Sequence, residues 1–100
     1  MITILKSKIR ALKIIRCSVE YEGSITIPRE IIAQADIKPY EKVEVNSKYG
    51  KGRILTYAIP GEQVELNGGA ANHFKEGEIV HVNVFRQVDF VNKDYKPIII

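Results

Sequence analysis

The dipeptide Gly23-Ser24 has the residue types needed for self-directed chemistry. Gly23 leaves its carbonyl sterically open and can adopt backbone angles that are closed to other residues. The Ser24 hydroxyl can attack this carbonyl, move the acyl group from nitrogen to oxygen and so create an ester. β-Elimination of the ester would cleave the chain and leave a dehydroalanine, whose hydrolysis releases ammonia and gives a pyruvoyl group. Taken alone, a Gly-Ser pair is more often a turn.

A second set of reactive groups lies on the predicted strand that contains Arg53, Thr56 and Tyr57. Arg53 can bind a carboxylate with two parallel hydrogen bonds, and Tyr57 can supply a proton to a carbanion. Thr56 can donate a hydrogen bond to the oxyanion of an acyl shift. On a regular strand Thr56 points away from the face shared by the other two, so one site needs a twist, a bulge or a subunit boundary. Taken alone, the segment has a simpler interpretation: threonine and tyrosine are common in strands, and the arginine lies in solvent.

The third motif is Asn67-Gly68-Gly69-Ala70-Ala71, a predicted turn that leads into a short helix. Backbone N–H groups at a helix start can hold an anion such as a carboxylate, although Asn-Gly is also a common hairpin turn. The first sixteen residues carry five basic side chains and no acidic ones, which favours an anionic ligand there unless these are simply solvated faces of strands. The five are Lys6, Lys8, Arg10, Lys13 and Arg16.

The elements expected to position these groups are mostly short strands. Runs rich in β-branched residues predict strands at 9–17, 24–27, 42–46, 53–59, 64–67, 79–85 and 98–100. Val80, Val82 and Val84 alternate with His81 and Asn83, as expected for a strand with one face inward. Short helices are predicted at 28–35, where Pro28 suits the first helical position, and at 70–74. Six or seven strands with one or two short helices favour a small closed β-barrel.

The whole chain fits one compact domain. It has 100 residues, of which 45% are hydrophobic and 27% charged, with a formal charge of +3. A chain this short favours self-association, and no apolar run reaches the length needed to cross a bilayer, so a cytoplasmic protein is expected. Cys17 is the only cysteine and is expected to be a small buried residue, and His73 and His81 have no companions with metal-ligand spacing.

These motifs, taken in order, resemble the pyruvoyl-dependent aspartate decarboxylases, the bacterial family that makes β-alanine for pantothenate and coenzyme A. The resemblance begins at Lys8 and continues through Tyr21-Glu22-Gly23-Ser24-Ile25, Arg53 with Thr56-Tyr57, Asn67-Gly68 with Ala70-Ala71, and Gly77-Glu78-Ile79-Val80. It implies a double-psi β-barrel over residues 1–100, a homotetramer with active sites between subunits, and decarboxylation of L-aspartate to β-alanine and CO2.

The resemblance also implies roles for individual residues. Ser24 would become the pyruvoyl group after cleavage into fragments 1–23 and 24–100, and this group would form a Schiff base with the substrate. Tyr57 would be the proton donor, and Thr56 would serve both processing and substrate binding. The substrate would also contact Lys8, Arg53 and the segment Asn67, Gly68, Gly69 and Ala70. No pyridoxal phosphate or metal is implied, and maturation is spontaneous or needs an accessory protein.

The sequence departs from the family at Arg10, where histidine is usual, and at Gly69, where alanine is usual. Two other classes remain open. The segment 24–30 followed by 42–45 also resembles swapped-hairpin DNA-binding regulators and antitoxins, whose basic residues would meet nucleic acid phosphates. That resemblance covers only about residues 22 to 45. The third class is an unprocessed, inactive decarboxylase-like homologue.

Overall fold

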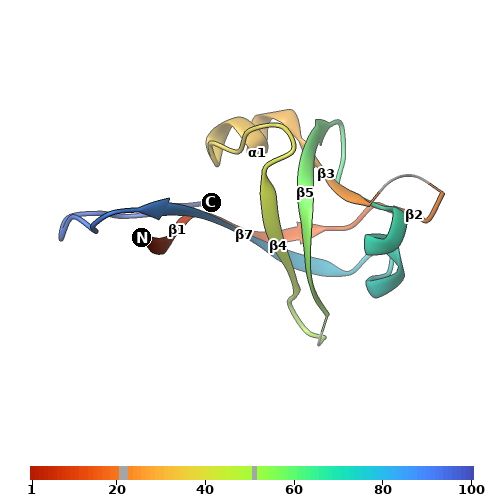
Figure 1. Ribbon diagram of the computed structural model, residues 1–100. Helices are drawn as coiled ribbons and strands as arrows, with labels where there is room; N and C mark the ends of the chain where they lie inside the picture. Colours follow the sequence, from red (N-terminus) through yellow and green to blue (C-terminus); the bar gives the residue numbers. More distant parts are fainter. Residues whose placement is uncertain (21–22, 51) are drawn as a thin grey trace.

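A computed structural model describes residues 1–20, 23–50 and 52–100 as a curled β-sheet with two short helices (Figure 1). The described chain contains eight strands in the order β2-β6-β3-β5-β4-β7-β1-β8. Their bounds are β1 Ile2–Lys13, β2 Arg16–Ser18, β3 Ser24–Pro28, β4 Lys42–Ser47, β5 Arg53–Gly61, β6 Glu65–Asn67, β7 Ile79–Val88 and β8 Ile98–Ile99. The helices are α1, Arg29–Gln34, and the 3-10 helix η1, Gly68–His73.

Antiparallel and parallel ladders both contribute to the sheet. The β1–β7, β4–β7, β4–β5 and β3–β6 pairs are antiparallel, whereas β3–β5, β2–β6 and β1–β8 are parallel. One hydrophobic core fills the interior, and Val80, Val82 and Val84 are fully buried within it, as their alternation predicted. The mainly β fold predicted from the sequence is therefore confirmed, and the sheet fits the small β-barrel that the resemblance implies.

The N-terminal strand differs from the prediction. The expected strand 9–17 is divided into β1 and β2, which raises the number of strands to eight in the described residues. The ladder with β7 shifts register between Ile9 and Leu12, and Ala11 lies in the left-handed region with φ of 60°. The N–H of Ile14 then bonds to the carbonyl of Glu78, just before β7, and that of Ile15 bonds to Val64 beside β6. The chain thus changes neighbours at this point, which ends one strand and starts another.

The two predicted helices exist, with shifted bounds. Pro28 precedes α1 as its cap residue, with φ of −52°, instead of occupying the first helical position. Ile32 is buried and Ile31 is partly buried against the core, so α1 docks on the sheet as expected. The second helix begins two residues earlier than predicted and is a 3-10 helix. Gly68 makes this start possible because its φ of 62° is readily adopted only without a side chain.

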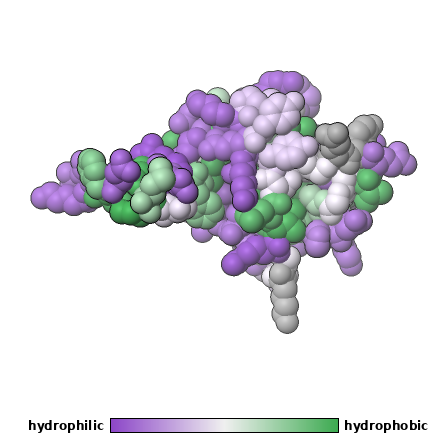
Figure 2. All heavy atoms as spheres, in the orientation of Figure 1, coloured by the Kyte–Doolittle hydropathy of each residue, from purple (hydrophilic) through white to green (hydrophobic). Residues whose placement is uncertain are grey.

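One end of the molecule projects as an arm, which consists of the start of β1, the end of β7 and residues 89–100 (Figure 1). Apolar side chains lie among hydrophilic ones on this arm (Figure 2). Exposed hydrophobic residues on it include Ile2, Phe90, Val91, Ile98 and Ile99. Neither helix in the described segments has the length and apolar character required to cross a bilayer. Cys17, expected to be buried, is only partly so, because the β2 strand that carries it lies at an edge of the sheet.

Candidate active site

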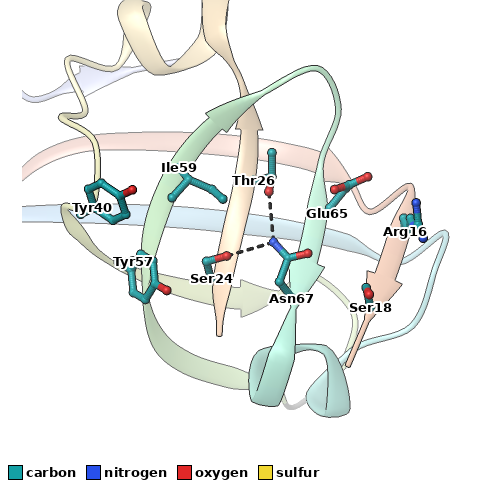
Figure 3. Close-up of a pocket in the computed structure, with 9 residues that line it drawn as sticks. All are labelled: Arg16, Ser18, Ser24, Thr26, Tyr40, Tyr57, Ile59, Glu65 and Asn67. Atoms are coloured by element: carbon teal, nitrogen blue, oxygen red, sulfur yellow. Dashed lines mark hydrogen bonds between the residues drawn. The ribbon is translucent and has the colours of Figure 1, made fainter. Parts of the chain in front are cut away.

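A pocket of about 470 Å³ lies over one face of four neighbouring strands (Figure 3). Alternate residues of each strand line it, together with Tyr40 from the turn before β4. The strand residues are Arg16 and Ser18 of β2, Glu65 and Asn67 of β6, Ser24 and Thr26 of β3, and Tyr57 and Ile59 of β5. Figure 3 places Ser24, Thr26 and Asn67 between the two tyrosines on one side and Arg16, Ser18 and Glu65 on the other.

The period-two pattern of the strands explains why these side chains share a face. Ile25, Ala58 and Leu66 lie between the lining positions and are 0% exposed, so they fix the opposite face of the strands against the core. The register pairs Ser24 with Asn67, and Thr26 with both Glu65 and Ile59. Burial of the apolar positions therefore orients the polar ones into the pocket.

Ser24 is buried in the pocket, and a side-chain hydrogen bond fixes its hydroxyl group. It is 3% exposed, and its Oγ accepts a hydrogen bond of 2.9 Å from Nδ2 of Asn67. The same nitrogen donates to Oγ1 of Thr26 at 3.1 Å. A side-chain carbon built on Gly23 would lie 3.9 Å from both the Asn67 carbonyl oxygen and the Gly69 amide nitrogen. The structure thus brings Gly23-Ser24 and the Asn67 motif together. Tyr21 and Glu22 of the sequence motif lie outside the described residues.

Tyr57 lines the same pocket as Ser24, and its ring packs against Tyr40. The two ring centroids are 5.8 Å apart and the planes are inclined by 39°. The sequence motifs did not indicate Tyr40, Thr26 or Glu65 as pocket residues. Arg16 was expected only as one of the basic residues of the N-terminal segment. The available signal for Tyr40 was its place after Pro39, which predicts a tight turn, but not the strand on which the turn docks.

Thr56 does not line this pocket. The β4–β5 ladder runs without a register shift from the Arg53–Asn46 pair to the Tyr57–Lys42 pair. Thr56 therefore shares the inner face of β5 with Ala58, and no bulge in this ladder turns it toward Tyr57. A twist, a bulge or a subunit boundary could have united Thr56 with Arg53 and Tyr57 in one site. This register excludes a bulge in the β4–β5 ladder.

The predicted cations Lys8 and Arg53 do not line the pocket either. Arg53 is exposed and lies on the face of β5 that also carries Tyr57. Lys8 pairs with Asn83 of β7, and Asn83 pairs with Glu44 of β4. Directly paired residues point to the same side of a sheet, so Lys8 of β1 and Arg53 of β5 lie on the same face of the sheet. Strands β7 and β4 lie between them.

A chain of hydrogen bonds connects the residues between the two cations. Nε of Arg53 donates to Oδ1 of Asn46 at 2.8 Å, and Nδ2 of Asn46 donates to Oε1 of Glu44 at 2.9 Å. Asn83 also donates to this carboxylate, at 3.1 Å. The hydrogen bond from Asn46, then that from Asn83 and the charge of Arg53, hold the pKa of Glu44 below its ordinary value, against the opposing effect of partial burial. Glu44 is therefore ionised and keeps Asn46 oriented toward Arg53.

The predicted substrate segment Gly68, Gly69 and Ala70 begins η1 directly after Asn67. Gly68 and Ala70 are buried, whereas Gly69 is exposed and has no atom within 4 Å of the place where a side-chain carbon would lie. The alanine that is usual in the family at this position would therefore fit without a clash.

The aspartate decarboxylase family matches residues 1–100. Aspartate 1-decarboxylase of Coprothermobacter proteolyticus is 43% identical over 89 residues, which cover 85% of this chain and 74% of that protein. The enzyme of the same name from Clostridium kluyveri is 38% identical over 104 aligned residues, covering 99% of this chain and 82% of its own length. That of Syntrophotalea carbinolica is 41% identical over 90 residues, with coverages of 85% and 68%. The chain thus belongs to the aspartate decarboxylase family.

Proposed function

We propose that this protein decarboxylates L-aspartate to β-alanine and CO2, using a pyruvoyl group derived from its own Ser24, and so supplies β-alanine for pantothenate and coenzyme A. The observation that carries the proposal is the buried Ser24 Oγ, which accepts a hydrogen bond from Asn67 and faces a pocket that also contains Tyr57. Family membership supplies the reaction, and the pocket supplies groups suited to it.

The residues around Ser24 fit both the formation and the retention of this group. Donation from Asn67 would hold Oγ in place for attack on the Gly23 carbonyl and stabilise the alkoxide as the hydroxyl loses its proton. Residues of β3 pair with β5 on one side and β6 on the other, so the new terminus would stay anchored in the sheet after cleavage. Once formed, the pyruvoyl group supplies an electron-withdrawing carbonyl that holds an amine substrate and stabilises the charge left by loss of CO2.

The remaining roles follow from placement and chemistry. The Tyr57 phenol, on the same pocket wall, gives a proton to the carbon that has lost CO2. Asn67 and the segment 68–70 border the substrate. Lys8 and Arg53 neutralise its carboxylates, and Thr56 assists processing and binding. Since these last three lie outside the pocket of a single chain, we propose a homotetramer in which active sites form between subunits. The exposed apolar residues of the arm suit such an assembly.

The proposed activity is tested by incubating the purified protein with L-aspartate and measuring β-alanine and CO2. Ser24→Ala should abolish both chain cleavage and turnover. Tyr57→Phe should leave cleavage intact and lower kcat by about 10²- to 10⁴-fold. Tyr49→Phe is a matched control, because Tyr49 is 83% exposed and lies outside the pocket, so its kcat should equal that of the wild type. Normal turnover by Tyr57→Phe, or cleavage of Ser24→Ala, would contradict these roles.

A further inference from the structure

Tyr40 adopts a backbone conformation that is unfavourable for its residue type. Its φ is 68°, in the left-handed region, where the side-chain carbon of a bulky residue is crowded. The turn that contains it is closed by a hydrogen bond of 3.0 Å from the N–H of Glu41 to the carbonyl of Lys38. Pro39 fixes a negative φ at the second position, so the turn has the type II pattern, whose third position normally takes glycine or asparagine. A tyrosine at this position therefore strains the backbone.

The strain is not offset by burial in the core, because Tyr40 is 73% exposed. Its ring instead packs on Tyr57, with centroids 5.8 Å apart, and both rings line the Ser24 pocket (Figure 3). Two backbone hydrogen bonds hold the turn on β5 beside Tyr57. The N–H of Tyr40 donates to the carbonyl of Ala58 at 2.8 Å, and the N–H of Ala58 donates to the carbonyl of Glu41 at 3.0 Å. The tyrosine is thus held at the position where it touches the proposed proton donor.

We infer that Tyr40 is a positioning residue for Tyr57. Packing of the Tyr40 ring covers one side of the Tyr57 ring and opposes its movement to another χ1 rotamer, which would carry the phenol oxygen away from the Ser24 end of the pocket. Strained backbone at a pocket wall is retained where the side chain serves the site. This inference rests on the proposed function, because it assigns Tyr40 to the proton transfer by Tyr57.

The test replaces Tyr40 by a residue that suits the backbone and lacks the ring. In Tyr40→Asn the strain is relieved, because asparagine accepts a left-handed φ, so Tm should equal the wild-type value or exceed it by up to about 8 °C. Cleavage at Gly23-Ser24 should proceed. The rate kcat should fall by about 10- to 100-fold, because small misplacement of a reacting group has effects of that size. Tyr40→Phe keeps the ring and should restore kcat to within about threefold.

A change of kcat without loss of Tm separates positioning from a structural role. Tyr49→Asn removes another exposed tyrosine and should leave kcat unchanged. Wild-type kcat in Tyr40→Asn would overturn the inference. A fall of both Tm and kcat in Tyr40→Asn, with a similar fall of both in Tyr40→Phe, would also overturn it. The parent proposal fails separately: if Tyr57→Phe turns over normally, Tyr57 is not the proton donor. If Tyr57→Phe is impaired and Tyr40→Asn is normal, only the role of Tyr40 is refuted.

Discussion

At the scale of single residues, Asn67 is the group that contacts the reactive hydroxyl. Its Nδ2 donates to Ser24 and Thr26 together, and the residue is 7% exposed, so water has little access to replace it. Asn67→Ala should therefore slow self-cleavage by about 10²-fold, because the Ser24 hydroxyl loses the donor that holds it for attack and misplacement of a reacting group has effects of that size. The time course of fragment appearance on a denaturing gel measures this. Asn92→Ala, which removes an exposed asparagine from the arm, should cleave at the wild-type rate. Equal rates for both variants would contradict the role of Asn67.

His81 gives a prediction about pH and stability. Its Nδ1 accepts a hydrogen bond of 3.2 Å from the N–H of Ala11, at the irregular part of β1. Burial, followed by the charges of Lys8, Lys48 and Arg10, lowers the pKa of His81. The unfolded chain therefore binds this proton at a higher pH than the folded chain, and stability falls as pH drops through about 6.5.

The substitution His81→Asn should weaken this dependence. The Oδ1 atom of asparagine takes the place of Nδ1 and can still accept from the N–H of Ala11, but the amide does not titrate. Between about pH 7.5 and 5.5, Tm of His81→Asn should fall less than Tm of the wild type, as thermal unfolding followed by circular dichroism would detect. An equal fall in the two proteins would show that other groups dominate the pH response.

At the scale of elements, β4 orients the cation carried by β5. Asn46 holds Nε of Arg53, which leaves the two terminal nitrogens of the guanidinium for a carboxylate. Asn46→Ala should raise KM for aspartate about fivefold, equivalent to the loss of one hydrogen bond of roughly 1 kcal/mol, with cleavage unchanged. In an Arg53→Lys background the same change should have no further effect, because lysine lacks Nε. Additive effects of the two substitutions would contradict the coupling.

Elements with strong patterns were predictable from the sequence. The alternation around Val82 gave β7, and Pro28 followed by Ile31 and Ile32 gave α1 to within a residue or two. The structure brings Ser24, Tyr57 and Asn67 into one pocket. The break after Lys13 was not predictable, because a segment rich in isoleucine gives no sign of where a strand exchanges one neighbour for another. Tyr40 was missed for a related reason: a turn motif does not specify its tertiary contact.

At the scale of the whole molecule, cleavage after Gly23 should not separate the two fragments. β1 lies between β7 and β8, and β2 pairs with β6, so both strands of fragment 1–23 are in ladders with fragment 24–100. Ile9, Leu12 and Ile14 are also buried in the common core. Burial of three such side chains, each worth about 1.5–3 kcal/mol, opposes dissociation. The cleaved protein should elute as one species from a sizing column and separate into two only in denaturant. Elution as separate native fragments would contradict this.

The central claim is that Gly23-Ser24 is cut and that Ser24 becomes a pyruvoyl group. Intact-mass spectrometry of the purified chain, after warm incubation of the folded protein, tests it most directly. The predicted result is two species, 1–23 and 24–100, the second lighter by one ammonia molecule than the product of simple hydrolysis. A persistent full-length chain would contradict spontaneous processing and favour the inactive homologue, and a second fragment with an ordinary serine terminus would contradict the pyruvoyl group.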